Sequence, residues 1–310
     1  MLRSAVGYRD LIEPLSLAFQ ASSAGRAQND MLVVRPDEVT ERGDVYVKSG
    51  VIHGEPVFIV KVSPWFAINV ERGQPQGGFI AVLDSATGHT RALLDEQHYL
   101  SDIRTAAAGA LAARALAPPV VTTAAVLGAG VQAYWQTCAL HGERGFESLM
   151  IWARDPERAY ALAERLAPIM PDVVFEIAPS AEAAVRAAEV VIVATASREP
   201  LVRGAWLRPG QHITSVGADD ATKCELDAES LGRARVFVDD RHTALTHGNV
   251  HRAVTRHGYR PEDLTGEIGA LLAGAMPGRV DPADITVASF IGTGVQDLVA
   301  ARVALEKLGY

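Results

Sequence analysis

Cysteine, aromatic residues, basic charge and long apolar runs are all scarce in this sequence of 310 residues. The two cysteines, Cys138 and Cys224, cannot build a disulfide framework. This low cysteine content is consistent with a reducing cytoplasm. No apolar run approaches the ~18 residues of a membrane span, and the amino-terminal stretch lacks the basic cap and apolar run of a signal peptide. We therefore expect a cytoplasmic protein without a membrane partner.

Charge and composition narrow the protein class further. Asp and Glu number 37 against 29 Lys and Arg, and the net charge of −8 argues against a nucleic-acid partner, because nucleic-acid-binding surfaces are normally basic. Aromatic residues make up only 6%, whereas alanine and glycine are abundant, as in alanine-rich helices packed closely on a sheet. At about 150 residues per domain, the length predicts two domains.

The first third of the chain is expected to form helices and an antiparallel sheet. Apolar residues at helical spacing predict an amphipathic helix over 4–23. Short segments rich in β-branched residues follow, and residues 84–88 link two of them as a hairpin would. An alanine-rich helix over 99–117 comes next, and Pro118-Pro119 ends it at an expected domain boundary.

Strand-like and helical segments alternate after the two prolines. The strands are nearly continuous apolar runs, and their alternation with helices predicts a doubly wound parallel sheet. A last helix, over 294–308, is expected to pack back on the first domain. The predicted fold class is therefore α/β, with a doubly wound domain over 119–290 and an α+β domain built from 1–118 plus 291–310.

The strongest local signal is a glycine loop, Gly128-Ala129-Gly130-Val131-Gln132. A strand runs into the loop and a helix follows it, so backbone amides and the positive end of the helix dipole would face a pyrophosphate. Gly128 permits the tight turn, Gly130 lets the phosphate approach the backbone, and Ala133 stands where a third glycine is usual. The loop predicts a Rossmann-type domain that binds NAD or NADP.

The ends of the neighbouring strands are expected to complete the cofactor site. Arg154 could pair with a 2′-phosphate and favours NADP, whereas Asp155 could hold a ribose hydroxyl, as in NAD-selective enzymes. Two structural alternatives stay open, Arg154 as a solvated turn residue and Asp155 as a helix cap. Further cofactor contacts are assigned to Thr195, Ala196, Ser197, Val216 and Gly217.

Several isolated polar residues have a structural as well as a functional interpretation. Lys61 lies in an apolar strand, where lysines often reach solvent from an edge, and Arg104 lies in an alanine-rich helix, where arginines are usually on the surface. Asp219 follows a strand at the edge where doubly wound folds bind ligands, although a turn or a cap would also explain it. His247 and His251 lack an acidic third ligand, so no metal site is expected.

Five motifs can be taken together. They are Val60-Lys61-Val62, Asp102-Ile103-Arg104-Thr105-Ala106-Ala107-Ala108, Leu127-Gly128-Ala129-Gly130-Val131-Gln132, Gly217-Ala218-Asp219 followed by Lys223-Cys224-Glu225-Leu226, and Gly292-Thr293-Gly294-Val295-Gln296-Asp297. With them the chain resembles the ornithine cyclodeaminase/mu-crystallin family. The Arg-Thr-Ala-Ala helix and the Gly-x-Gly-x-Gln loop carry most of the resemblance.

The resemblance implies a role for each isolated polar residue. In the family, the residue at Lys61 faces the substrate and serves catalysis, the residue at Arg104 clamps the substrate carboxylate, and the residue at Asp219 acts in proton transfer beside the nicotinamide. The residue types suit this chemistry, because a planar carboxylate calls for a guanidinium and an imine accepts hydride more readily when protonated. The resemblance also implies a homodimer in which the first domains join their sheets, so the domain over 1–118 plus 291–310 is expected to bind substrate and to dimerise.

The chain departs from the family's cyclodeaminases in its expected substrate pocket. Those enzymes carry a glutamate where this chain has Lys48, and a threonine or serine where it has Gln76, a residue that we assign to substrate binding. Asn249 and Phe290 also differ from many members of the family. The pocket therefore lacks the acid best placed to hold a distal ammonium group, which weakens L-ornithine as a substrate.

The sequence thus predicts an NAD(P)-dependent oxidoreductase that acts on the C–N bond of a small amino or imino acid. It would be an imine or ketimine reductase, or an amino-acid dehydrogenase. The first alternative is an ornithine cyclodeaminase, which converts L-ornithine to L-proline and ammonia. The second is a non-catalytic, crystallin-like protein that binds NADP or another ligand.

Overall fold

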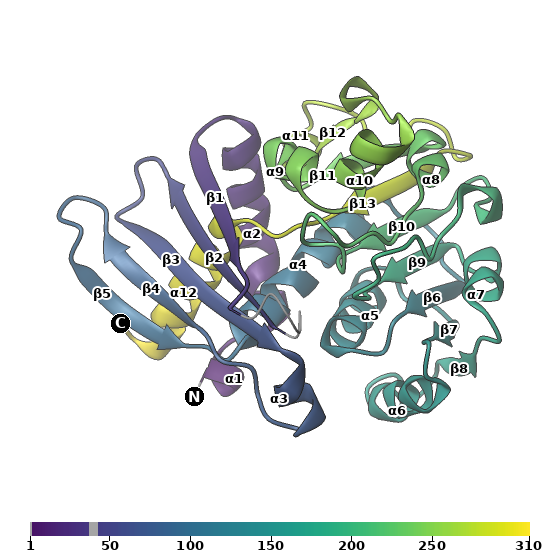
Figure 1. Ribbon diagram of the computed structural model, residues 1–310, viewed down its shortest axis with the longest axis horizontal. Helices are drawn as coiled ribbons and strands as arrows, with labels where there is room; N and C mark the ends of the chain where they lie inside the picture. Colours follow the sequence, from purple (N-terminus) through teal and green to yellow (C-terminus); the bar gives the residue numbers. More distant parts are fainter. Residues whose placement is uncertain (1, 37–42) are drawn as a thin grey trace. The chain divides into compact units, whose positions relative to one another are not determined.

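The computed structural model describes residues 2–36 and 43–310, which form two compact units (Figure 1). Unit 1 comprises the residues up to Ala107 together with Gly292–Tyr310, and unit 2 comprises Ala108–Ile291. One unit holds an antiparallel sheet and the other a parallel sheet flanked by helices, so the predicted α/β fold class is confirmed. In the described part of the chain, no helix is both long enough and apolar enough to cross a bilayer.

Unit 1 is built on a five-stranded antiparallel sheet, in which every strand pairs with the next one along the chain. The strands are β1 (Ala27–Val34), β2 (Gly43–Ile52), β3 (Val57–Phe66), β4 (Phe79–Asp84) and β5 (Thr90–Asp95). The expected hairpin links β4 and β5, and Asp84 Oδ1 accepts hydrogen bonds there from the backbone N–H groups of Ala86 and Thr87. Buried and intermediate residues alternate along most of β2–β4, and intermediate and exposed residues alternate along β1, as expected when one face of a sheet packs on helices.

The helices of unit 1 come from both ends of the chain. They are α1 (Leu2–Ala5), α2 (Tyr8–Ser23), α3 (Ala67–Glu71), the first part of α4 (Tyr99–Leu116) and α12 (Gly294–Leu308). The last of these packs on β2, β3 and α2, as expected for the C-terminal helix (Figure 1). Its amino end lies directly on β2, because a Cβ at Gly50 would be 2.2 Å from the carbonyl carbon of Gly294. The helix predicted over 4–23 is interrupted at Gly7, which has extended backbone and caps α2.

Unit 2 is built on an eight-stranded parallel sheet with the order β12-β11-β13-β10-β9-β6-β7-β8. The strands are β6 (Thr123–Leu127), β7 (Ser148–Trp152), β8 (Val174–Ile177), β9 (Val190–Val193), β10 (His212–Ser215), β11 (Ala234–Val238), β12 (Gly266–Glu267) and β13 (Ile285–Ser289). From β6 the chain first builds outward through β7 and β8, and it then resumes on the other side with β9. The carboxyl ends of β6 and β9 therefore form a topological switch point, where doubly wound sheets bind their ligands.

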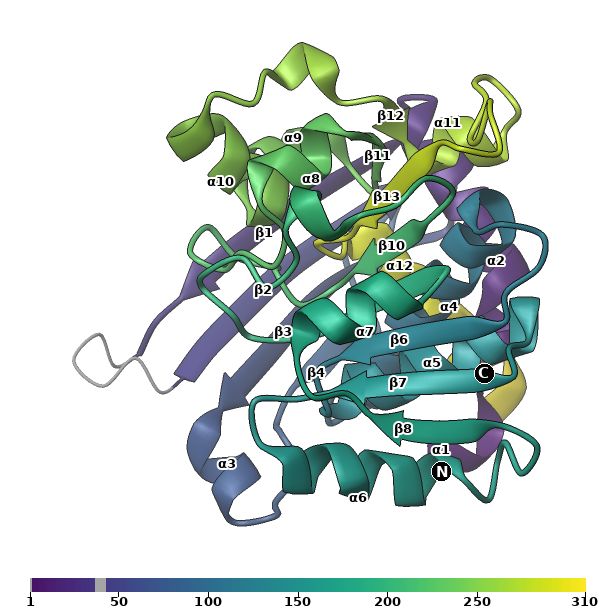
Figure 2. The same cartoon turned by 90° about the vertical axis from the view of Figure 1, so that its right-hand side faces the viewer.

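Helices cover both faces of the parallel sheet, as the nearly continuous apolar strands require. In unit 2 these are the second part of α4, then α5 (Val131–Arg144), α6 (Pro156–Leu166), α7 (Ala181–Ala187), α8 (Ala228–Gly232), α9 (Arg241–Thr246), α10 (Gly248–His257) and α11 (Ile268–Leu272). Figure 2 shows α7 in front of β6 and α5 behind it. Fully buried residues of the central strands form the core, among them Val191, Val193, Val236, Val238 and Val287.

Candidate functional site

A buried cluster of charged side chains lies at the centre of unit 1. Asp297, in the first turn of α12, pairs through Oδ2 with Lys61 Nζ of β3 at 2.8 Å and through Oδ1 with Arg104 Nε of α4 at 3.0 Å. Lys61 is 2% exposed, Arg104 6% and Asp297 0%. The structure thus brings together Lys61 and Arg104, two of the three unit 1 residues expected to bind substrate, and it places one carboxylate between them.

Further hydrogen bonds orient both cations. Lys61 Nζ donates to Ser101 Oγ at 3.1 Å, and that hydroxyl donates to Glu96 Oε1 at 2.8 Å. Arg104 Nη1 donates to Gln296 Oε1 at 2.9 Å, and Arg104 Nη2 has no hydrogen-bond partner within residues 2–36 and 43–310. Two of the three guanidinium nitrogens are therefore held by the protein, and Nη2 can donate to a ligand.

Burial sets the protonation of this cluster. Burial lowers the pKa of Lys61 below its ordinary value, and the charge of Asp297 only partly opposes the effect. For Asp297, burial alone would raise the pKa, but the charges of Lys61, Arg104 and Lys48 outweigh it and hold the pKa below the usual range. The site therefore combines a firmly ionised carboxylate with an amine that releases its proton more readily than a surface lysine does.

Lys48 lies on the same face of the sheet as Lys61. The two lysines are direct partners in the β2–β3 register, and Lys48 is only 4% exposed. Its Nζ donates a hydrogen bond to Gly292 O at 2.7 Å. Like charges directly opposite each other destabilise a sheet, so the second cation, Lys48, lowers the stability of the β2–β3 pair. A distal ammonium group of a substrate would be repelled here.

Gln76 has a structural role in the loop after α3. Its Oε1 accepts a hydrogen bond from the backbone N–H of Phe66 at 2.8 Å, and its Nε2 donates to Phe66 O at 3.1 Å. Asn69 Nδ2 also donates to Oε1, at 3.2 Å. These bonds fasten the loop to the end of β3. The assignment of Gln76 to substrate binding stays a prediction.

The glycine loop of unit 2 has the geometry expected of a phosphate cradle. Gly128 has a φ of +114°, and a Cβ there would lie 2.3 Å from Ala194 O, so the turn requires glycine. Gly130 caps α5 without a side-chain hydrogen bond, and a Cβ on it would meet no atom within 4 Å. A 14-residue helix therefore begins at the switch point, where the backbone amides and the dipole of a helix N-terminus favour an anion. The loop fits the pyrophosphate of a dinucleotide.

The two polar residues after β7 have different environments. Asp155 Oδ1 accepts a hydrogen bond from Glu157 N at 3.1 Å, so Asp155 caps α6, one of the two alternatives that its sequence position allowed. The Arg154 side chain is exposed at the carboxyl end of β7, the strand next to β6. Of the two residues, Arg154 is thus the one whose charged group is not engaged in a helix cap.

A buried glutamate that sequence reasoning passed over joins two of the expected cofactor loops. Glu225 is 0% exposed, and its Oε1 accepts hydrogen bonds from Thr195 N at 2.6 Å and Thr195 Oγ1 at 2.8 Å. Its Oε2 accepts from Ser215 Oγ at 2.6 Å and Gly217 N at 3.0 Å. Burial raises the pKa of Glu225 to about 7, against the effect of these donors. Glu225 lies in the Lys223-Cys224-Glu225-Leu226 motif, but the local sequence gave no sign of its partners.

Asp219 is paired with a neighbouring lysine in unit 2. Its Oδ1 lies 2.6 Å from Lys223 Nζ, and the side chains are 32% and 19% exposed. The adjacent Asp220 is buried, and its Oδ1 accepts hydrogen bonds from Thr222 N and Lys223 N, as in a turn. Asp220 thus stabilises a turn, whereas the Asp219 side chain is partly exposed. The catalytic role of Asp219 stays a prediction.

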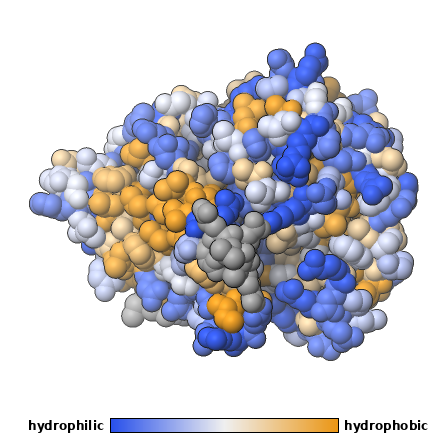
Figure 3. Space-filling view, viewed as in Figure 1, coloured by the Kyte–Doolittle hydropathy of each residue, from blue (hydrophilic) through white to orange (hydrophobic). Residues whose placement is uncertain are grey.

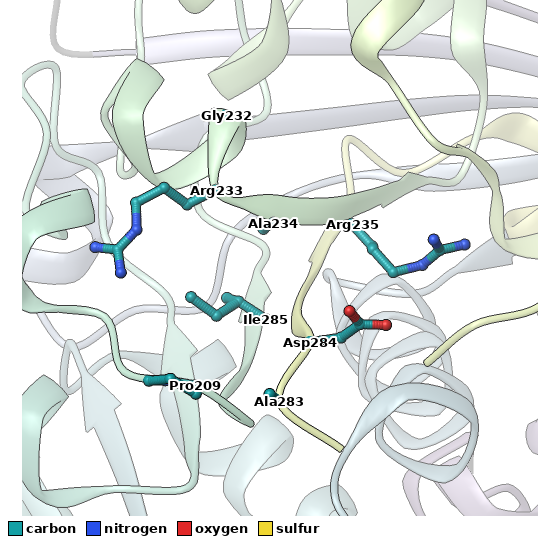
Figure 4. Close-up of a pocket in the computed structure, with 8 residues that line it drawn as sticks. All are labelled: Pro209, Gly232, Arg233, Ala234, Arg235, Ala283, Asp284 and Ile285. Carbon is teal, nitrogen blue, oxygen red and sulfur yellow. The ribbon is translucent and has the colours of Figure 1, made fainter. Parts of the chain in front are cut away.

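A separate pocket in unit 2 lies away from these loops. Its volume is about 390 Å³, and it opens at the amino ends of β11 and β13 (Figure 4). The residues that line it include Arg233, Arg235 and Asp284. In a parallel sheet the amino ends of the strands lie opposite to their carboxyl ends, and the glycine loop follows a carboxyl end. The pocket is therefore not part of the candidate cofactor site.

Comparisons with known proteins extend over nearly the whole chain. The sequence model of the ornithine cyclodeaminase/mu-crystallin family matches residues 3–309. An uncharacterized cyclodeaminase from Sinorhizobium fredii is 36% identical over 300 residues, 96% of this chain and 90% of the relative. The ketimine reductase mu-crystallin of Mus musculus is 30% identical over 301 residues, 96% of this chain and 91% of the relative. The structure of Thermococcus litoralis Δ(1)-pyrroline-2-carboxylate reductase in complex with NADH and L-proline has a TM-score of 0.91 at 27% identity, and the match covers 99% of this chain and 94% of that one.

Proposed function

Because this chain belongs to the ornithine cyclodeaminase/mu-crystallin family, we propose that it catalyses hydride transfer at the C–N bond of a small amino or imino acid. The family contains NAD(P)-dependent imine and ketimine reductases and cyclodeaminases, and this chain is an NAD(P)-dependent enzyme of that kind. The proposed reaction is imine reduction, or its reverse, amino-acid oxidation. The buried Lys61–Asp297–Arg104 cluster carries the proposal, because it joins a carboxylate-binding group to a proton-exchanging one.

Arg104 binds the substrate carboxylate in this proposal. Asp297 and Gln296 hold Nε and Nη1, so the plane of the guanidinium is set before substrate arrives. Charge-assisted hydrogen bonds from a rigid, mostly buried guanidinium are stronger and more directional than those of a mobile surface group. The carboxylate of an α-amino or α-imino acid would thereby fix the position of the carbon and nitrogen that react.

Lys61 moves the proton of the substrate nitrogen. Its lowered pKa makes it a better proton donor than an ordinary lysine, and the Ser101–Glu96 pair orients its Nζ. A protonated imine nitrogen makes its carbon more electrophilic, which is what hydride addition requires. Asp219, paired with Lys223 in unit 2, keeps its predicted role in proton transfer beside the nicotinamide.

The glycine loop and the strand ends of unit 2 hold the dinucleotide in this proposal. When bound, its nicotinamide supplies or accepts the hydride. The N-terminus of α5 receives the pyrophosphate, and Thr195–Ser197 with Val216 and Gly217 lie at the next two strand ends. The cap made by Asp155 leaves Arg154 as the charged group at the ribose position, which supports NADP over NAD.

The cyclodeaminase reaction is less well supported. It needs a group that holds the distal ammonium of L-ornithine, and the position expected for that acid carries the buried Lys48. A cation there repels an ammonium group. The proposal therefore expects reduction of imino acids and no release of ammonia from L-ornithine.

An assay of the purified protein tests the proposed function. NADH and NADPH oxidation is followed separately with cyclic 2-imino acids and with 2-oxo acids plus an amine. We expect turnover with at least one member of this panel, faster with NADPH than with NADH, and no ammonia from L-ornithine. Absence of turnover with every member would contradict the proposal. Ammonia release from L-ornithine without net NADH would instead establish the cyclodeaminase reaction.

The outward face of the unit 1 sheet supports a homodimer. Apolar side chains gather over this sheet in Figure 3, and several are well exposed, including Leu32 at 60% and Leu93 at 64%. The register aligns Leu32, Val47, Val62 and Phe79 in one row across four strands. Apolar patches of this kind mark interaction surfaces. We propose that two copies of the chain join these faces.

Light scattering of the purified protein tests the homodimer. The wild type should have twice the mass of the 33.0 kDa chain. Leu93→Glu, which puts a charge on the proposed interface, should give a monomer of unchanged secondary structure. As a matched surface control, Tyr160→Glu in α6 of unit 2 should stay dimeric. A monomeric wild type, or a Leu93→Glu protein that remains dimeric, would contradict this interface.

A further inference from the structure

The carboxylate of Glu225 ties together the ends of two neighbouring strands at the switch point. Thr195 follows β9, whereas Ser215 and Gly217 lie at the end of β10, and each strand end donates to a different oxygen of Glu225. The loops also touch directly, because a Cβ at Gly217 would lie 2.0 Å from Thr195 O. The β9 end in turn contacts the glycine loop at Gly128. These contacts form one continuous path across the three loops.

A count of hydrogens shows that the network needs an acceptor with two equivalent oxygens. The four groups aimed at Glu225 are two backbone N–H groups and two hydroxyls. The hydroxyl of Ser215 has one proton, which it donates to Glu225, while its oxygen accepts from Asn249 Nδ2 at 2.8 Å. A carboxylate satisfies this arrangement, whereas a carboxamide in either orientation would turn its N–H₂ group toward a backbone N–H, of Thr195 or of Gly217.

Asn249 fixes the backbone that carries Glu225. Its Oδ1 accepts from Glu225 N at 2.7 Å and Leu226 N at 3.1 Å, and its Nδ2 also donates to Ser289 Oγ at 3.1 Å. Asn249 is 0% exposed and lies on α10. An amide is needed there because the side chain must accept on one side and donate on the other. Asn249 thus holds the main chain of Glu225, and the side chain of Glu225 accepts hydrogen bonds from the two strand ends.

We propose that Glu225 is a positioning residue, which holds the Thr195–Ser197 and Val216–Gly217 loops at the spacing that the dinucleotide requires. The inference rests on the proposed function, because those loops are assigned to the cofactor there. Glu225 itself is fully buried, so it acts through the loop amides. Loss of its carboxylate would let the strand ends separate. Part of the binding free energy of the cofactor would then be spent on reordering the loops, so its affinity would fall.

Glu225→Gln tests the proposal against a matched carboxylate-to-amide change. Asp227→Asn is the control, since Asp227 Oδ1 also accepts from two backbone N–H groups, of Gly204 and Ser230, and from the Ser230 hydroxyl. The dissociation constant of NADH and NADPH is measured by fluorescence titration, and the melting temperature of the ligand-free protein is measured beside it. Hydrogen bonds to a charged group are each worth about tenfold or more in an equilibrium constant. Glu225→Gln should therefore weaken dinucleotide binding by at least about tenfold, and Asp227→Asn should lower the melting temperature without weakening binding.

A milder variant keeps the test decisive if Glu225→Gln fails to fold. Ser215→Ala removes one donor to the carboxylate and is not among the assigned cofactor contacts, and it should weaken dinucleotide binding by a few-fold. Unchanged binding in Glu225→Gln or in Ser215→Ala would overturn the inference while leaving the proposed function intact. Equal weakening in Asp227→Asn would also overturn it, because general destabilisation would then be the cause. A wild type that binds neither dinucleotide would overturn the proposed function and the inference together.

Discussion

Replacing Asp297 by asparagine should lower the free energy of unfolding by about 3–5 kcal/mol, the cost of leaving a buried charge without its partner. The carboxylate is fully buried between Lys61 and Arg104, and both of those side chains are themselves buried. A neutral amide can accept from only one of the two cations, and its N–H₂ group faces the other. Chemical denaturation followed by circular dichroism measures the loss.

The loss in Asp297→Asn should also depend on pH. Burial already lowers the pKa of Lys61, and removal of the Asp297 charge lowers it further. The unfolded chain then binds the Lys61 proton at pH values where the folded chain does not, so stability rises with pH in this window. The deficit of the variant should be largest near neutral pH and should shrink as the pH approaches the ordinary pKa of lysine. It should also shrink in acid, where protonation of Asp297 removes the same charge from the wild type. A deficit that is constant with pH would contradict this account.

A carboxylate on the same packing interface provides the control for Asp297. Glu55 Oε2 pairs with Arg302 Nη1 of α12, but the side chains are 32% and 33% exposed. Because exposed pairs contribute little, Glu55→Gln should change the free energy of unfolding by less than about 1 kcal/mol. If Asp297→Asn cost no more than Glu55→Gln, the cluster would not be the charged core described above.

Replacing Arg104 by alanine should lower kcat/KM for the imino acid by about 10²–10³-fold, because truncating one partner of a buried charge pair costs 2–5 kcal/mol. The substrate carboxylate loses its guanidinium, and the geometry of the reacting carbon is no longer set. Arg104→Lys should recover part of the loss, since an ammonium keeps the charge without the planar fork. Steady-state kinetics with the imino acid of highest activity measures both variants.

Arg114 lies on the same helix and makes a suitable control for Arg104. Its Nε pairs with Glu143 Oε2 at 2.8 Å, and its side chain is 41% exposed. Arg114→Ala should leave kcat/KM unchanged. The dissociation constant of NADH should stay at the wild-type value in Arg104→Ala, which separates loss of substrate binding from loss of folding. Unchanged turnover in Arg104→Ala would refute the assigned role of this residue.

The features that sequence predicted well are local ones. Alternating strands and helices, the hairpin at residues 84–88 and the turn at Gly128 depend on residues a few positions apart, so their patterns are visible along the chain. The carboxyl ends of the strands could be identified in the same way, because strand direction follows from the βαβ order. At Asp155 the sequence allowed either a contact with a ribose hydroxyl or a helix cap, and the hydrogen bond from Glu157 N in the structure shows the cap.

The residues that sequence reasoning missed act through distant partners. Asp297 and Glu225 both lie in motifs that carry the family resemblance, but a role could be assigned to each only from its contacts. Arg104 and Asp297 are 193 residues apart in sequence, and Glu225 is 30 residues from Thr195. Lys48 was known only as a departure from the cyclodeaminases, and its place opposite Lys61 follows from the β2–β3 register.

The sequence by itself determined that this chain has a doubly wound domain with a glycine loop between a strand and a helix, because hydrophobic period and glycine conformation are local properties. Tertiary structure alone decided which charges meet. The C-terminal helix returns to the first sheet and brings Asp297 between Lys61 and Arg104, and the fold of unit 2 brings Glu225 beneath two strand ends. The physical reason is that a buried charge is tolerated only where the fold supplies its partners, and those partners come from any part of the chain.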